Sequence, residues 1–253
     1  MGKYIGKRTL TGLLCIVMAL CINFIIIHAA PGDPIRLLAG TDTATPEMIE
    51  ALTQKYGLDQ PVHIQFIRYV GNLLKGDMGT SIYTNEPVAK EIMNRLGPTV
   101  LLALSASLTA LLLGTMLGIF CARHVGSRLD MALGSVSYLF DSTPSFWLGL
   151  MMMLFFSLKL GILPSYGVDS GWKSYVMPVI ALSLPSLAEV IRMTRSAMLD
   201  TIHQDYIRTA RAKGRLEGGV IFGHALKNAL MPVITVIGSN FGSLLGGAVV
   251  IET

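Results

Sequence analysis

Charged residues are scarce in this sequence. Asp, Glu, Lys and Arg make up only 14% of its 253 residues, whereas 52% are hydrophobic, and the mean hydropathy is +0.57. Because soluble domains carry about 25% charged residues, this scarcity excludes an ordinary soluble domain. The net charge of +4 does not require a nucleic-acid partner, since basic residues that flank apolar runs are typical of cytoplasmic membrane loops.

Reactive and metal-binding residue types are few and scattered. Cys15, Cys21 and Cys121 lie in apolar runs without ligand-like spacing, so they are interpreted as reduced packing residues, with a disulfide or metal site as the alternative. The five histidines form no cluster, and we predict neither a metal site nor a cofactor. The sequence also lacks a Gly-x-x-x-x-Gly-Lys-Ser/Thr loop, so the chain is not expected to hold ATP. No nucleophile and base pattern indicates an enzyme.

The first apolar run covers residues 9–30 and follows Lys3, Lys7 and Arg8. At about 1.5 Å per helical residue it is long enough to cross a bilayer, and it is longer than the apolar region of a signal peptide. The basic flank predicts a cytoplasmic N-terminus. The two prolines in residues 31–34 are expected to end this helix.

A soluble composition follows over residues 33–95. Residues 44–56 predict an amphipathic helix that is capped by Thr45 or its neighbour and has Pro46 at its first position. Residues 62–74 predict a second helix with apolar periodicity. This segment is expected outside the membrane, either as a small cap over the outer mouth or as a solvated connector.

The second apolar run, residues 98–122, carries Gly114 and Gly118 four positions apart. Small residues at this spacing allow two membrane helices to approach closely. Arg123 and Arg128 then mark a short basic loop, which we expect in the cytoplasm.

The third run, residues 131–158, is interrupted by Asp141, Ser142 and Pro144. If the helix begins at Met131, Asp141 lies near mid-membrane, and an intramembrane carboxylate is a candidate pathway residue. In the alternative interpretation residues 131–140 lie at the interface and the span begins near Pro144. The sequence leaves both possibilities open.

Two further spans complete the pattern. Residues 175–188 are predicted to cross the membrane despite two prolines, because Arg192 and Arg195 must return to the cytoplasmic side. Residues 229–251 form the last apolar run. It carries a stripe of small residues at helical spacing, for which we predict a packing role; its members are Gly238, Gly242 and Gly246.

A polar, basic segment lies between the last two spans. Asp205 is expected to cap a helix over residues 206–213, with Ile207 and Ala210 on one side. Gly214 suits a left-handed position after the helix end. Taken alone, such a segment is also consistent with a solvated basic helix or with a helix-turn-helix that binds nucleic acid.

A second helical run is predicted over residues 217–229. It leads to Pro232, which is expected near the first turn of a following helix.

The strings DYIRTARAKG and HALKNALMPVIT resemble the cytoplasmic coupling loop of permease subunits of ABC importers, in the branch that imports peptides, glutathione or nickel chelates. Gly214 matches the loop glycine of that family. Arg208, Thr209 and Ala210 replace its Glu-Ala-Ala opening, a departure shared by the peptide and nickel branch. The resemblance assigns ATPase coupling to Asp205, Tyr206, Arg208, Thr209, Ala210, Arg211, Ala212, Lys213 and Gly214.

The resemblance implies an all-α polytopic helical bundle of the ABC importer type. Residues 1–97 are expected to form the N-terminal span and extracytoplasmic segment, and residues 98–253 an incomplete transmembrane domain with its coupling loop at residues 200–230. Five spans are counted here, and a sixth is expected beyond this chain. The implied location is the inner membrane, in multiple passes.

The implied partners are the lipid bilayer, a homologous permease, two ABC ATPases and an extracytoplasmic binding protein, with no nucleic acid. On the coupling helix, Tyr206 is expected to anchor the ATPase with Ala210 beside it, while Arg208 and Arg211 lie at the rim. The competing hypothesis is an ion-coupled transporter or channel that uses Asp141. It leaves the basic loop unexplained, and the sequence shows no inverted repeat.

Overall fold

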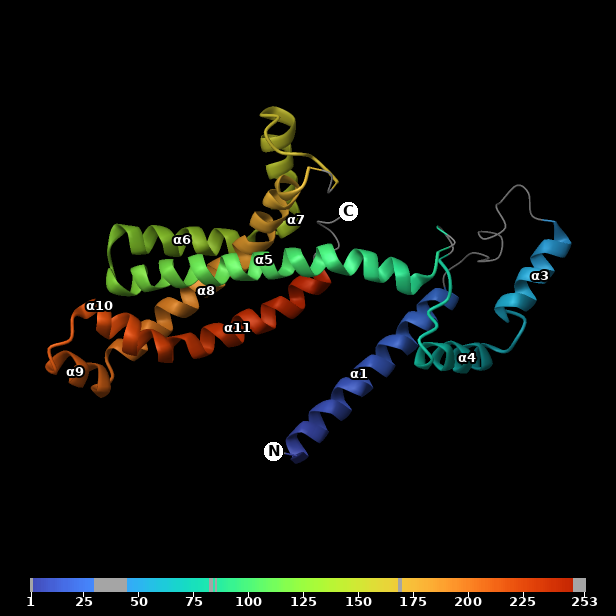
Figure 1. Ribbon diagram of the computed structural model, residues 1–253, viewed down its shortest axis with the longest axis horizontal. Coiled ribbons are helices and arrows are strands. Elements are labelled where there is room, and N and C mark those ends of the chain that lie inside the picture. The colour runs from blue at the N-terminus through green and yellow to red at the C-terminus, as the bar shows by residue number, and fades with distance from the viewer. Residues whose placement is uncertain (1, 30–44, 82–83, 85, 168–169, 248–253) are drawn as a thin grey trace. The chain divides into compact units, whose positions relative to one another are not determined.

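The computed structural model describes residues 2–29, 45–81, 84, 86–167 and 170–247 (Figure 1). The predicted helix end at residues 31–34 lies outside them. The described residues are helical or irregular, apart from one isolated β-bridge between Thr80 and Pro87. The predicted all-α class is therefore confirmed.

The chain divides into two compact units, Met1–Met93 and Asn94–Thr253. The first unit contains α1 (Gly2–Ala29), α3 (Pro46–Tyr56) and α4 (Val62–Leu74). The bounds of α4 are those predicted from its apolar periodicity, and α3 begins at Pro46, as expected for a proline in the first helical turn.

Aromatic side chains join α1 to α4 within the first unit. The ring centroids of Phe24 and Phe66 lie 5.1 Å apart, and those of Phe24 and Tyr69 lie 6.1 Å apart. A hydrogen bond of 3.0 Å joins His28 Nε2 to Gln65 Oε1. The apolar helix α1 buries none of its own residues, consistent with a helix that is surrounded by lipid.

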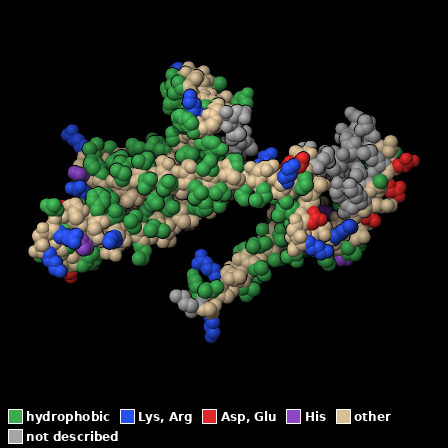
Figure 2. Space-filling view, viewed as in Figure 1, with side chains coloured by type: hydrophobic (Ala, Val, Ile, Leu, Met, Phe, Trp, Pro, Cys, Tyr) green, Lys and Arg blue, Asp and Glu red, His purple; other side chains and the backbone are tan. Residues whose placement is uncertain are grey.

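The second unit is a bundle of long apolar helices, and the division between the units falls within α5. Figure 2 shows hydrophobic side chains over much of the visible surface of these helices. In chain order the elements are α5 (Val88–Arg123), α6 (Arg128–Ser142), α7 (Ser145–Met152), the π-helix η1 (Met153–Lys159), α8 (Trp172–Ile202), α9 (Asp205–Ala212), α10 (Glu217–Val220), the π-helix η2 (Ile221–Ala225) and α11 (Leu226–Gly247).

Among the described residues, four helices are long and apolar enough to cross a membrane: α1, α5, α8 and the continuous helix from α10 into α11. A fifth span results if α6 with the helix that follows it is counted as one. The count agrees with the five predicted spans and confirms a polytopic helical membrane protein.

The predicted third span is bent. Residues 128–142 and 145–159 form two helices that meet at 99°. Thr143 lies between them in an extended conformation, with φ −97° and ψ 123°, because the ring of Pro144 disfavours the helical conformation for the residue before it. The interruption predicted at Asp141, Ser142 and Pro144 is therefore a sharp bend, and a helix does begin directly after Pro144.

Two other prolines lie inside helices where the sequence predicted helix ends. α5 starts at Val88 and continues through Pro98, and α11 continues through Pro232. The predicted stop at residue 229 is thus wrong. A proline removes one backbone hydrogen bond, and neighbouring helices or water in a membrane bundle can satisfy the freed carbonyl.

Candidate functional site

α9 begins at Asp205, one residue earlier than predicted. Gln204 is the N-cap, with φ −73° and ψ 149°, and no side chain caps the helix. Asp205 is already in the first helical turn, so the prediction that it caps the helix is wrong. Its negative charge at this position still favours the positive end of the helix dipole. At the other end, Gly214 has a φ of 73°, the left-handed conformation that glycine adopts without strain.

One face of α9 is buried inside the chain itself. Ile207 is 0% exposed and Ala210 is 8% exposed. Both belong to a hydrophobic cluster that joins α9 to five other elements. Its other members are Ile119 and Ala122 of α5, Met198 of α8, Val220 of α10, Ile221 and Ala225 of η2, and Ala229 of α11. Ala210 therefore does not lie on an exposed docking face, which corrects the expectation that it contacts a partner beside Tyr206.

The opposite face of α9 is exposed and basic. Arg208, Thr209, Arg211, Ala212 and Lys213 are all exposed. Figure 2 shows Lys and Arg side chains gathered at the end of the second unit that carries α9.

Two side chains of α9 are tied to the helices that follow it. Arg211 binds Glu217 with nitrogen–oxygen distances of 2.8 and 3.2 Å, and the bond to this carboxylate raises the pKa of the arginine. The amide of Asn228 donates a 2.7 Å hydrogen bond to the hydroxyl of Tyr206. The Tyr206 side chain remains 43% exposed.

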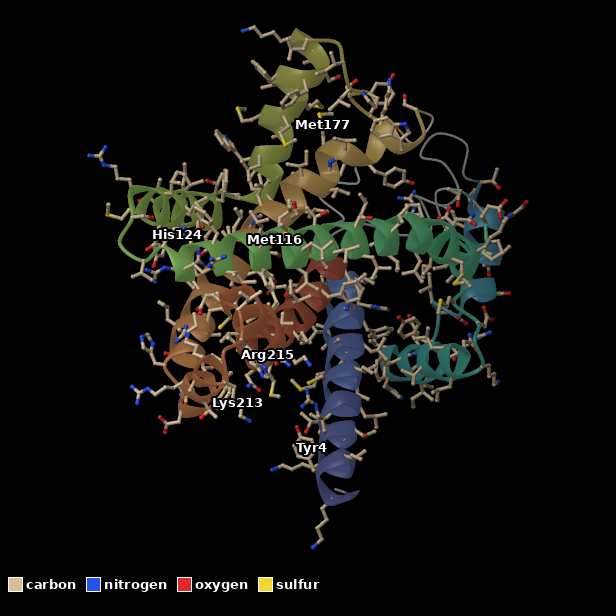
Figure 3. All side chains as sticks on the ribbon, turned by 60° about the vertical axis from the view of Figure 1, so that its left-hand side comes forward. Tyr4, Met116, His124, Met177, Lys213 and Arg215 are labelled. Carbon is tan, nitrogen blue, oxygen red and sulfur yellow. The ribbon has the colours of Figure 1, made fainter. Side chains whose placement is uncertain are left out.

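Three cations in this region have no such partner. Arg208, Lys213 and Arg215 form no ion pair with any residue that the structure describes. Lys213 and Arg215 are labelled in Figure 3.

Two ion pairs connect α6 to α8. Arg195 binds both carboxylate oxygens of Asp130, at 2.7 and 2.9 Å, and the backbone N–H of Gly126 donates a further hydrogen bond of 3.0 Å to Asp130. Near the break between α6 and α7, Arg192 donates one hydrogen bond of 2.7 Å to Asp141.

A polar pocket of about 230 Å³ lies where α6, α7, α8 and α11 approach one another. Its apolar lining consists of Leu182, Pro185 and Leu244. The amide of Asn240 on α11 donates a 2.7 Å hydrogen bond to Glu189 on α8, so the pocket wall is itself hydrogen-bonded across two helices. The polar lining residues are Asp141, Ser145, Ser186, Glu189, Asn240 and Ser243.

Comparisons with known proteins identify the family. The family described as the inner membrane component of binding-protein-dependent transport systems matches residues 114–253, and its N-terminal domain family matches residues 1–103. The chain belongs to this family. It is a transport permease subunit of the ABC importer type, and its family and apolar helices support a multi-pass inner membrane protein.

Relatives that match the whole length of the chain are also transport permeases. The permease is 40% identical over 255 residues to the glutathione transport system permease protein GsiC of Salmonella paratyphi A. This match covers 100% of this chain and 82% of that protein. It is 39% identical over 257 residues to the GsiC protein of Escherichia coli, with the same coverage.

The structure separates the predicted pathway residues of the permease. Asp141 lines the polar pocket. Ser142 and Pro144 instead line a more open hollow of about 320 Å³, together with Thr143, Phe146 and Trp147. The assignment of all three to a transport pathway stays a prediction.

The two predicted glycine interfaces differ. A Cβ on Gly114 lies 2.7 Å from Val190, and one on Gly118 lies 2.5 Å from Thr194, so α5 and α8 approach closely at both. A Cβ on Gly238, Gly242 or Gly246 meets no described atom within 4 Å. These three glycines of α11 therefore contact no other described helix of this chain, and their packing role stays a prediction.

Glu189 and Asn240 are not among the site residues predicted from the sequence. Glu189 directly follows the apolar run of residues 175–188 and lies outside that predicted span. The structure extends α8 from Trp172 to Ile202 and places Glu189 near its middle. A carboxylate within a helix that long and apolar is the signal that could have identified it. Within the described residues, no three His, Cys, Asp or Glu side chains are grouped as metal ligands.

Proposed function

We propose that this permease forms, with a homologous second permease, the membrane pathway of an ATP-driven importer for small peptides, glutathione-like peptides or nickel chelates. Two separate ABC ATPases provide the energy, and an extracytoplasmic binding protein delivers the substrate. The names of the relatives, which are glutathione transport permeases, support a small peptide as substrate.

The attachment of α9 to the bundle carries this proposal. Its buried face shares one hydrophobic cluster with the ends of α5, α8 and the helix that leads into α11. Packed interiors resist deformation and transmit displacement. A partner that moves α9 therefore moves three spanning helices with it, as required of a device that converts ATPase closure into transport.

The exposed face of α9 supplies the docking surface. Tyr206 is the proposed anchor, because it is large, stiff and oriented by Asn228 through its hydroxyl. The exposed cations Arg208 and Lys213 lie at the rim, where each ion pair contributes about 1 kcal/mol at most. Binding of this surface drives transport only if the ATPase prefers one transporter state over the other.

The orientation follows from the distribution of basic residues. Lys3, Lys7 and Arg8 at the start of α1 and the basic face of α9 both favour the cytoplasmic side. The N-terminus of this permease is therefore cytoplasmic, and the soluble segment between α1 and α5 lies outside the membrane.

The polar pocket belongs to the proposed pathway. Side chains such as Asp141 and Glu189 are costly in lipid and are expected at a water-filled cavity. In the ion-coupled alternative Asp141 binds the driving ion, but Arg192 already occupies its carboxylate. We therefore retain only the ATP-driven function.

Transport and ATP hydrolysis by the complete importer in the same vesicles test the function. We expect Tyr206→Ala to lower uptake of glutathione much more than ATP hydrolysis. Arg208→Ala is the matched control, because it removes an exposed side chain from the same helix at the rim. If the Tyr206 variant transports at the wild-type rate and the Arg208 variant does not, the docking surface is assigned to the wrong side chains.

A further inference from the structure

The polar pocket contains one carboxylate without a balancing charge among the described residues. Asp141 is neutralised by Arg192 at 2.7 Å. Glu189 instead accepts a hydrogen bond from the neutral amide of Asn240, and no ion pair joins Glu189 to a described residue. The pocket therefore favours a ligand that brings a positive charge.

The neighbouring groups indicate which cation fits. Ser186 and Ser243 line the pocket with hydroxyl groups that can accept hydrogen bonds. Because the Nδ2 of Asn240 donates to Glu189, its carbonyl oxygen remains available as an acceptor. An ammonium group has three donors and no acceptor, so its donors match a carboxylate surrounded by neutral oxygens.

We propose that Glu189, with Asn240 and the adjacent serines, binds the protonated amino group of the transported substrate. This inference rests on the proposed function and adds the part of the substrate that the permease itself recognises. A pocket of about 230 Å³ is smaller than a typical drug-sized site of about 300–1,000 Å³. It accommodates one end of a small peptide, while the rest of the substrate extends into the open pathway.

Other ligand classes fit less well. A free anion is repelled by Glu189, and a divalent metal prefers several converging ligands of its own, whereas Asp141 is already bound to Arg192. A hydrophobic cation gains little from hydroxyl and amide oxygens that require hydrogen-bond donors. A primary ammonium group satisfies both the charge and the hydrogen bonds.

Direct binding to the nucleotide-free importer complex, without the binding protein, tests the inference. The probes are glutathione and N-acetylglutathione, which differ in the charge of the amino group. We expect wild type to bind glutathione at least about tenfold more tightly than the acetylated form, since a hydrogen bond to a charged group is worth this much or more. E189Q should abolish the preference, whereas E189D, which keeps the charge, should retain most of it.

The controls separate recognition from folding and from the general function. The amide of E189Q can still accept from Asn240, so its thermal unfolding should match wild type. Equal affinities for both probes in wild type, a preference unchanged in E189Q, or no detectable glutathione binding each overturns the inference. Uptake of glutathione by the wild-type importer in vesicles is measured alongside. Its absence contradicts the proposed peptide transport itself, whereas uptake that is insensitive to Glu189 contradicts only the amino-group site.

Discussion

Arg192 and Arg195 lie one turn apart on α8, and each binds an aspartate of α6, but their surroundings differ. The two pairs differ in the burial of the carboxylate, not of the arginine, since Arg195 is 36% and Arg192 26% exposed. Asp130, the partner of Arg195, is only 5% exposed and accepts two hydrogen bonds from the guanidinium. Asp141, the partner of Arg192, is 47% exposed and accepts one. The buried pair lies near the helix ends that hold α9, whereas the exposed pair borders the polar pocket.

The difference separates a fixed region from an adaptable one. A bidentate pair with a buried carboxylate is costly to break, because loss of the arginine leaves a buried charge without a cationic partner. A more exposed pair with a single hydrogen bond contributes little to stability. The permease therefore joins α6 to α8 more firmly where the ATPase is proposed to act than beside the pocket where the substrate is proposed to pass.

The largest expected effect comes from breaking the buried pair. Arg195→Met leaves the carboxylate of Asp130 buried without a cationic partner, with the Gly126 N–H and the Cys121 thiol as neutral donors. We expect the free energy of unfolding to fall by about 3–5 kcal/mol, measured by denaturation of the purified complex in detergent.

A double variant provides the control for this prediction. Arg195→Met combined with Asp130→Leu removes both charges and should recover a large part of the lost stability. If adding Asp130→Leu to Arg195→Met lowers the free energy of unfolding further, the two residues are not coupled. The contrast between the two ion pairs is then wrong.

A smaller effect is expected where α5 touches α8 beside the buried pair. Gly118→Ala places a Cβ 2.5 Å from that of Thr194 and 2.8 Å from the carbonyl oxygen of Ile191. The helices must separate, at a cost of about 1–3 kcal/mol. Gly134→Ala on α6 meets nothing within 4 Å and is the matched control. Equal unfolding midpoints for the two variants would show that this contact does not stabilise the bundle.

A further test concerns the turn after α9. Gly214→Val forces a β-branched residue into a left-handed conformation and costs about 1–2 kcal/mol or more of local strain, although no atom lies within 4 Å of the added Cβ. We expect uptake to fall while the subunit still inserts. Gly214→Asn should retain transport, because asparagine tolerates this conformation; full transport by the valine variant would remove the turn from the mechanism.

The smallest effect on stability is expected at the exposed pair. Asp141→Asn should change the free energy of unfolding by no more than about 1 kcal/mol and yet lower uptake, since the pocket loses one of its charges. Unfolding and initial uptake rate are measured on the same preparation. A loss of stability as large as that of Arg195→Met would erase the distinction between the two pairs.

Local patterns in the sequence predicted much of this structure. Apolar periodicity gave the bounds of α4 and placed Ile207 and Ala210 on one face of α9, and the preference of glycine for left-handed turns anticipated the conformation of Gly214. These features depend on residues within one or two helical turns of each other. They can therefore be predicted without knowledge of the tertiary structure.

Contacts between distant residues could not be predicted in this way. Asn240 binds Glu189 across 51 residues, and Arg195 binds Asp130 across 65. No local pattern pairs them. Similarly, Pro98 and Pro232 indicate helix ends when taken alone, but the packed bundle maintains the helix through both. Exposure of Tyr206 together with burial of Ala210, four residues away, depends on which face of α9 the other helices cover.

The central claim, that the exposed face of α9 docks the ATPase, can be tested by site-specific photo-crosslinking in the assembled importer. A photoreactive phenylalanine analogue replaces either Arg208 on α9 or Tyr166, which is 90% exposed in the loop between η1 and α8. We expect a crosslinked product with the ATPase from position 208 and none from position 166. Crosslinking to the ATPase from position 166 with none from position 208 would contradict the account.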